Sequence, residues 1–104
     1  MALNNVPAEG IGLSLEAVLD MRVATPLKDM LLQGLAQKRN LIIDASAVSR
    51  MSTACVQVLA AFILETQKTN TSLVISRMSP VFESAFTNLG LGGILEAVKP
   101  QAMQ

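Results

Sequence analysis

Apolar and polar residues alternate near the beginning of the chain. Leu13, Leu15, Ala17 and Leu19 are each separated by one residue, and a period of two is typical of a strand with one buried face. Residues 1–10 mix Asn, Pro, Glu and Gly and predict an irregular lead-in. The first expected element is therefore a strand over residues 13–19.

Thr25-Pro26 predicts the start of a first helix. Thr25 can cap free N–H groups, and Pro26 suits the first helical position because its missing N–H is not needed there. Lys38 and Arg39 favour a helix C-terminus, and Asn40 can take the left-handed conformation that closes a helix. The apolar residues between these signals share one helical face: Leu27, Leu31, Gly34 and Leu35.

Two short apolar runs predict further strands. Residues 41–43, rich in β-branched side chains and bounded by polar residues, predict a central strand buried on both faces. Residues 73–75 predict another strand, which follows a turn at residues 69–71. Residues 94–95 predict a last short strand or turn, and the tail from Lys99 is polar.

Two more helices are predicted between and after these strands. Ser52 is the expected cap of a helix that runs to about Lys68, with Cys55, Leu59, Phe62 and Ile63 on one face. Ser79-Pro80 repeats the cap and proline of the first helix. Phe82, Phe86 and Leu89 share one face of this last helix, which Gly90 closes.

Strands and helices thus alternate along the chain, and this order predicts an α/β fold. We expect a mostly parallel sheet of about four strands with helices packed on it. The 104 residues fit a single domain, 1–104, with a core over about residues 13–98. Within it, Leu41, Ile43, Leu59, Phe62 and Phe86 are predicted core residues.

Charge and composition exclude several classes of partner. Eight basic and eight acidic residues give a net charge of zero, whereas nucleic-acid binding needs a surplus of cations. The longest apolar stretch, residues 56–64, is broken by Gln57 and is too short to span a bilayer. The N-terminus lacks the cationic segment of a signal peptide, and the one cysteine forms no intramolecular disulfide. We expect a cytoplasmic location and no insertion into a membrane.

The inventory of reactive side chains argues against an enzyme. The sequence has no His, so it offers neither a His general base nor a His metal ligand. The single Cys55 cannot build a thiolate zinc site, and its place on an apolar face favours a buried core residue over a reactive thiol. Gly90-Leu91-Gly92-Gly93 follows a helix, which favours a helix stop over a phosphate cradle. We therefore expect no cofactor, no metal and no small-molecule ligand, and set aside the rival interpretation as a small enzyme.

The segment from Asp44 to Ala54 is the candidate site. It follows the central strand and opens a helix, and ligands and partners of open α/β sheets meet this edge. Four hydroxyl residues gather here: Ser46, Ser49, Ser52 and Thr53. A phosphate on Ser52 or Thr53 would be stabilised by the positive end of the helix. The alternative interpretation is plain helix capping by Ser52, with Thr53 as an ordinary first-turn residue.

Residues 41–59 resemble the signature of STAS domains, a family named for sulfate transporters and anti-sigma-factor antagonists. The shared pattern is an apolar strand that ends in Asp44, Ser46 two residues on, a short loop, and hydroxyl and small residues that open a helix. Ser79-Pro80 and Leu89-Gly90-Leu91 match the start and end of the third STAS helix, so the resemblance spans about residues 13–98.

The resemblance implies a non-enzymatic domain that binds a protein partner and that phosphorylation can release. Three positions depart from the family pattern: Ser52 stands in place of Asp, Cys55 in place of Gly, and Ala54 in place of the phosphorylated Ser of anti-sigma antagonists. Thr53 matches the hydroxyl residue that directly follows this Asp in the family pattern. The Thr-Ala version resembles STAS subunits of lipid-transporting ABC complexes and small STAS proteins that accompany chemotaxis histidine kinases.

We therefore predict reversible docking to a histidine-kinase-type or anti-sigma-type regulator, with Thr53 as the regulatory hydroxyl. The alternative is a regulatory subunit of a lipid-type ABC transporter that uses the same loop without phosphorylation. The predicted partner-binding residues come from the loop and the first turns of the second helix: Asp44, Ser46, Ser49, Arg50, Met51, Ser52, Thr53, Val56 and Gln57.

Overall fold

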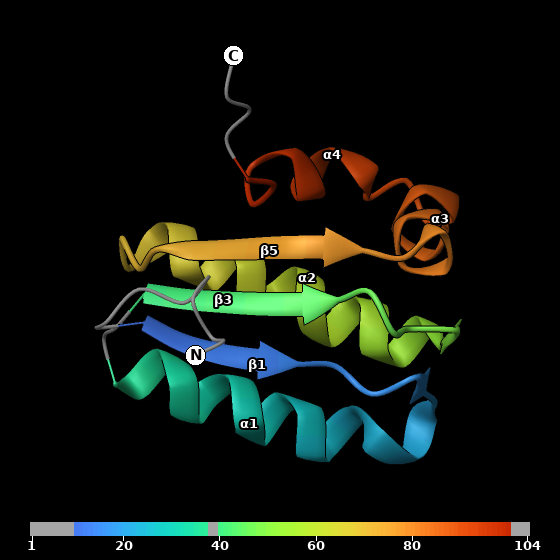
Figure 1. Cartoon of the computed structure of the whole chain (residues 1–104), viewed down its shortest axis with the longest axis horizontal. Coiled ribbons are helices and arrows are strands. Elements are labelled where there is room, and N and C mark those ends of the chain that lie inside the picture. Colours follow the sequence, from blue (N-terminus) through green and yellow to red (C-terminus); the bar gives the residue numbers. More distant parts are fainter. Residues whose placement is uncertain (1–9, 38–39, 101–104) are drawn as a thin grey trace, which may run out of the picture.

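The computed structural model describes residues 10–37 and 40–100. Strands and helices alternate along this part of the chain, as the sequence predicts (Figure 1). The elements in chain order are β1 (Gly10–Ser14), β2 (Val18–Leu19), the 3-10 helix η2 (Met21–Val23), α1 (Ala24–Ala36), β3 (Asn40–Ala45), β4 (Arg50–Met51), α2 (Thr53–Lys68), β5 (Leu73–Met78), α3 (Pro80–Asn88) and α4 (Gly92–Glu96).

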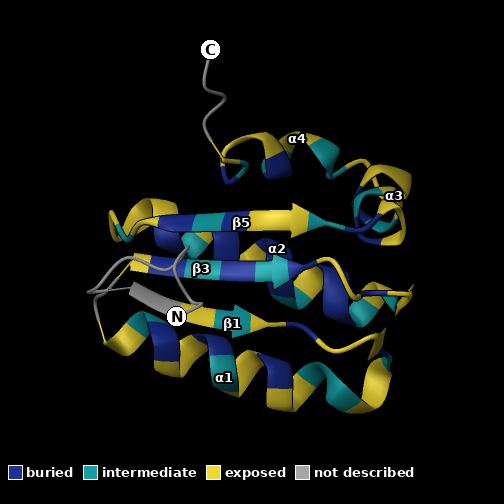
Figure 2. Cartoon of the chain, viewed as in Figure 1, coloured by how far each residue is buried: buried dark blue, intermediate teal, exposed yellow. Residues whose placement is uncertain are grey.

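The main sheet is parallel and has the strand order β1-β3-β5. β3 is its central strand, as predicted, and α2 crosses behind it while α1 flanks the β1 side (Figure 1). Leu41 and Ile43 of β3 are fully buried, whereas Ile42 between them is half-buried. The expectation that this strand is buried on both faces is therefore wrong, because the face that carries Leu41 and Ile43 is buried whereas the face that carries Ile42 and Asp44 is half-buried (Figure 2).

The predicted strand over residues 13–19 is two strands. β1 pairs with β3 and ends at Ser14, and β2 pairs instead with β4 in a separate parallel ladder. Ala17, between the two strands, is exposed, so the predicted alternation fails there. The chain bends away from the main sheet after Leu15, because β2 takes its hydrogen-bond partners from the segment between β3 and α2.

The start of α1 also differs from the prediction. Asp20 caps η2 by accepting a hydrogen bond from the Arg22 backbone N–H at 2.9 Å, and η2 runs directly into α1. Thr25 therefore lies inside the first turn of α1 and is not its cap. Lys38 and Arg39 lie outside the described residues, and Asn40 begins β3 without closing the helix in a left-handed conformation.

Gly34 places α1 close to the central strand. A Cβ atom at this position would lie 3.1 Å from a Leu41 methyl group, which is tighter than ordinary contact. The predicted inner face of α1 is confirmed, with Leu27 and Leu31 buried and Leu35 half-buried. Glycine thus lets the first helix approach the sheet more closely than a larger residue would.

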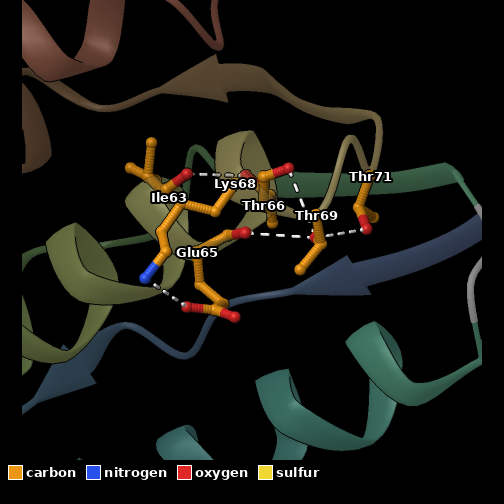
Figure 3. Close-up of polar contacts among 6 residues, drawn as sticks. All are labelled: Ile63, Glu65, Thr66, Lys68, Thr69 and Thr71. Carbon is orange, nitrogen blue, oxygen red and sulfur yellow. Dashed lines mark hydrogen bonds and ion pairs between the residues drawn. The ribbon is translucent and has the colours of Figure 1, made fainter.

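α2 runs from Thr53 to Lys68 and is closed by threonines. Thr66 is 1% exposed, and its hydroxyl donates to the Ile63 carbonyl at 2.7 Å (Figure 3). The Thr69 hydroxyl donates to the Glu65 carbonyl at 3.1 Å and lies 2.9 Å from the Thr71 hydroxyl (Figure 3). The predicted turn follows at Asn70, whose positive φ of 58° reverses the chain toward β5.

The last two helices close the molecule beyond β5 (Figure 1). Phe82 and Phe86 of α3 are fully buried, with ring centroids 5.1 Å apart. Leu89 is 44% exposed, contrary to its predicted place on the same face, because the helix ends at Asn88. Gly90 has a φ of +76° and stops α3 as predicted.

Residues 94–95 belong to α4 and form no strand. The Val98 carbonyl after α4 accepts a hydrogen bond from the Ile75 N–H at 2.8 Å, so this segment satisfies part of the outer edge of β5. Lys99, next along the chain, lies 3.1 Å from a Glu96 oxygen and 3.5 Å from a Glu83 oxygen. The C-terminal segment is thereby attached to both α3 and β5.

The predicted core is confirmed: Leu41, Ile43, Leu59, Phe62 and Phe86 are all buried. Phe86→Ala is expected to lower the free energy of unfolding by about 3–5 kcal/mol, because it leaves a cavity at a fully buried position. Leu89→Ala, one turn further along, is the matched control and is expected to cost less than about 1 kcal/mol. Urea denaturation of both variants measures the difference, and equal costs would contradict the assigned face of α3.

Candidate functional site

The candidate site is the segment that leaves the C-terminal end of β3 and enters α2. It begins with a tight turn in which Asp44 accepts a hydrogen bond from the Ser46 backbone N–H at 2.9 Å. Val48 then turns inward and is 2% exposed. Met51 is half-buried on β4, and Ser52 leads into the helix. The segment is therefore an ordered path over the edge of the main sheet.

The β2 segment fixes the backbone of this path. The Ala17 carbonyl accepts from the Ser49 N–H at 2.7 Å and the Arg50 N–H at 3.1 Å, and the Leu19 carbonyl accepts from the Ser52 N–H at 2.8 Å. The Ser49 hydroxyl donates to the Ala17 carbonyl as well, at 3.1 Å. Three backbone donors between β3 and α2 are thus bound by a strand that lies about 30 residues earlier in the chain.

A second anchor comes from the start of α3. The Ser79 hydroxyl donates to the Val48 carbonyl at 2.6 Å and accepts from the Phe82 N–H at 3.1 Å. The Ser79 N–H donates to the Ala45 carbonyl, the last residue of β3. One buried serine therefore caps α3 and holds the loop to the sheet.

Ser52 and Thr53 have different positions at the start of α2: Ser52 caps the helix, and Thr53 is exposed on its first turn. The Ser52 hydroxyl accepts from the Cys55 N–H at 3.3 Å and is the N-cap of α2. Thr53 is the first helical residue and is exposed. The next residue, Ala54, is half-buried. Thr53 is thus a hydroxyl that reaches solvent at the positive end of a 16-residue helix.

Cys55 and Val56 point into the protein. Cys55 is fully buried, and its Sγ lies 3.3 Å from the Asp20 carbonyl, to which the thiol donates. This confirms the interpretation of Cys55 as a core residue. Val56 is 1% exposed, so its side chain is unavailable to a docking partner. Its inclusion among the predicted partner-binding residues is a mistake, because the helix turns this position toward the sheet.

The remaining predicted residues lie at the surface. Ser46, Ser49, Arg50, Thr53 and Gln57 are exposed, and Asp44, Met51 and Ser52 are half-buried. We call these eight residues the docking loop surface. They lie together because they follow one another from the end of β3 into the second turn of α2.

Asp44 carries the negative charge of this surface. Hydrogen bonds from the Ser46 hydroxyl and backbone N–H hold the pKa of Asp44 below its ordinary value, and the positive charge of Arg77 acts in the same direction. Asp44 and Arg77 are paired in the register of β3 and β5. Asp44 is therefore ionised at neutral pH, and it fixes the turn at Ser46.

α3 lies beside β4 and the docking loop surface, and the sequence did not predict this contact. A shallow hollow of about 340 Å³ lies between Met51 of β4 and the side of α3 that carries Pro80 and Val81. Val81 is 41% exposed. Ser79-Pro80 signalled where this helix begins, but the contact between α3 and β4 joins segments about 30 residues apart, for which no local signal exists.

The described residues hold no cluster of three or more His, Cys, Asp or Glu side chains that could bind a metal ion. Among residues 10–37 and 40–100, no helix combines the length and the apolar character needed to cross a bilayer. The arrangement at the docking loop surface offers hydroxyl groups, one cation and one carboxylate on a fixed backbone.

Comparison with known proteins identifies the family. Residues 5–96 match the family model described as "Mlab, STAS domain". The chain belongs to the STAS domain family. The resemblance noted at residues 41–59 is thereby confirmed, and the match covers most of this STAS domain.

A solved structure shares the fold of this STAS domain. It is described as that of the anti-sigma factor antagonist SpoIIAA in its unphosphorylated form, and it is 18% identical in sequence with a TM-score of 0.68. The alignment covers 95% of this chain and 84% of that chain. At this identity the likeness shows a common fold. No curated protein sequence matches the chain at a significant level.

Ser79→Ala is expected to lower the free energy of unfolding by about 1–3 kcal/mol, because it removes the α3 cap and leaves the buried Val48 carbonyl without its donor. Ser84→Ala is the matched control, since Ser84 lies exposed on the same helix and alanine is the better helix former. Chemical denaturation of both variants measures the costs. A Ser79 variant as stable as the Ser84 variant would contradict the proposed anchor.

Asp44→Asn is expected to lower the melting temperature at neutral pH and to lose this effect in acid. The pKa of Asp44 is lowered in the folded chain, so folding favours the ionised form. Its contribution is complete above the ordinary pKa of 3.8 and disappears as the pH falls through the lower folded-state pKa. Thermal melts of wild type and variant from about pH 7 to about pH 2 test this. A constant difference over that range would show that the charge is irrelevant.

Proposed function

We propose that this STAS domain is a non-enzymatic signalling module that docks reversibly to a protein partner through the docking loop surface. The partner that the site favours is a histidine-kinase-type or anti-sigma-type regulator in the cytoplasm. Phosphorylation at Thr53 is the proposed switch that releases it. The observation that carries this proposal is the exposed hydroxyl of Thr53 at the start of α2, beside a backbone held by β2 and α3.

The geometry supports Thr53 over Ser52 as the modified residue. Ser52 is half-buried, and its hydroxyl is engaged as the N-cap of α2. Thr53 is exposed and is the first residue of the helix, one position beyond the cap. A phosphate on Thr53 would face the N–H groups at the positive end of α2, which stabilise negative charge. The modification would therefore change the surface without unfolding the helix.

The docking loop surface suits a switch because hydrogen bonds from β2 and α3 hold its backbone and its exposed groups are few. Arg50 offers a charge that a partner carboxylate could pair with, and Met51 offers apolar contact at its half-buried side chain. A new phosphate beside them would have to be desolvated or repelled when the partner docks. Binding would then weaken although the fold is unchanged.

The second candidate is a regulatory subunit of a lipid-type ABC transporter. Ala54 favours it, because this residue stands where anti-sigma antagonists of the family carry their phosphorylated serine. In this function the Thr53 hydroxyl would contact the partner directly and constitutively. The two candidates differ in what removal of the hydroxyl does to binding.

Thr53→Glu is expected to keep the melting temperature of the wild type and to weaken partner binding about tenfold or more. A negative charge in the first turn of α2 is favoured by up to about 1 kcal/mol, so the fold is retained. The partner is first isolated by pull-down from the native cytoplasm, and its affinity for each variant is then measured by titration calorimetry.

Two further variants separate the candidates. Thr53→Ala is expected to bind the isolated partner constitutively if the hydroxyl is a phosphate acceptor, and to lose binding if the transporter function is correct. Ala54→Ser is the control and is expected to leave the affinity unchanged. If Thr53→Glu and Thr53→Ala both bind as the wild type does, the interface lies elsewhere and the proposal is wrong.

A further inference from the structure

A groove that adjoins the docking loop surface at Gln57 runs between the outer faces of α1 and α2. Its volume is about 590 Å³, and side chains from both helices line it. Leu31, 1% exposed, lies at its base, and Leu32, 46% exposed, stands on its α1 side. Ala54 and Ala61 line the α2 side. An apolar groove with a half-exposed leucine on its rim is a surface suited to docking.

The shape of the groove favours a convex occupant. α1 and α2 each lead into a strand of the same parallel sheet, β3 and β5, and the two helices run in the same direction (Figure 1). The small side chains of Ala54 and Ala61 leave the space between them hollow. A single helix presents a ridge of side chains that fits such a hollow. A second copy of the chain would present the same hollow and leave the space unfilled.

Two charges mark opposite ends of the groove. Lys28 lies near the start of α1, and Glu65 lies near the end of α2. Because the helices are parallel, Lys28 is at the end close to Thr53 and Glu65 is at the far end. Lys28 is exposed, and among the described residues Glu65 forms a loose ion pair with Lys68, at 3.9 Å. An occupant that carries one acid and one base, at opposite ends, therefore complements the groove.

We propose that the α1–α2 groove binds an amphipathic helix of a protein partner, with an apolar ridge between the two helices, an acidic residue beside Lys28 and a basic residue beside Glu65. This extends the proposed docking function, because Ala54 and Gln57 line the end of the groove next to Thr53. One partner could therefore contact the docking loop surface and the groove together. The groove can be tested without phosphorylation and without the native partner.

The probes are three fluorescent synthetic helices of about 18 residues with leucines at i, i+3, i+4 and i+7. One carries Glu and Lys at opposite ends of the ridge, and the others carry Lys at both ends or Glu at both ends. Fluorescence anisotropy with the full chain is expected to show that wild type prefers the Glu/Lys helix by about two- to fivefold. Lys28→Glu makes both ends of the groove acidic and should transfer the preference to the Lys/Lys helix.

The chain offers a matched pair of leucine variants. Leu32 lines the groove and Leu64 does not, yet they are 46% and 48% exposed. Leu32→Asp is expected to weaken binding of the Glu/Lys helix at least about tenfold, and Leu64→Asp to leave it unchanged. Circular dichroism of both variants confirms that they fold.

Three outcomes would overturn the proposal: no binding of any helix, equal loss in the two leucine variants, or a preference that Lys28→Glu leaves unaltered. Sedimentation of the chain alone tests the rival occupant, since a dimer that Leu32→Asp dissociates would assign the groove to a second copy. Thr53→Ala should bind the Glu/Lys helix as wild type does. The groove and the phosphorylation switch can therefore fail independently.

Discussion

Backbone groups that folding removes from water must find hydrogen-bond partners, and this requirement shapes the whole edge of the sheet where β3 ends. The buried Val48 carbonyl receives the Ser79 hydroxyl, and the N–H groups of Ser49 and Arg50 share the Ala17 carbonyl. These contacts tie two distant parts of the chain to one short loop. The docking loop surface has a defined form because its backbone is bound from both sides.

This arrangement separates the roles of neighbouring side chains. Ser52 and Ser79 serve the fold, each as the cap of a helix. Cys55 and Val56 serve the core. What remains for a partner is a small set of exposed groups, with Thr53 at the positive end of α2. A charge can therefore be added at Thr53 with little effect on the fold, because the helix dipole favours it and no core contact depends on it.

The N-terminal end of α2 is also where two surfaces meet. Thr53 belongs to the docking loop surface, and Ala54 and Gln57 line the end of the α1–α2 groove. The periodicity of the helix causes this, since residues 53, 54 and 57 face outward while 55, 56 and 59 face the sheet. A partner that contacts both the loop and the groove would bind the Thr53 hydroxyl and the apolar groove through one continuous interface.

The sequence by itself determined the elements whose signals are local. Capping serines at Ser52 and Ser79, the left-handed stop at Gly90, and the apolar faces of α1 and α2 are properties of a few consecutive residues, and all are present in the structure. On α3 the predicted face holds for Phe82 and Phe86 but not for Leu89, which lies beyond the helix end. The order of these elements was enough to predict a parallel α/β fold, and the segment 41–59 was enough to indicate the family.

Only the tertiary structure decided how the N-terminal strand divides and where helix α1 begins. β2 leaves the main sheet because it pairs with β4, which is 32 residues away, and such pairing leaves no trace in either segment alone. The same holds for the contact of α3 with β4. Hydrophobic periodicity records which face of an element is apolar, but the neighbour that covers a face is chosen by the packing of the whole chain.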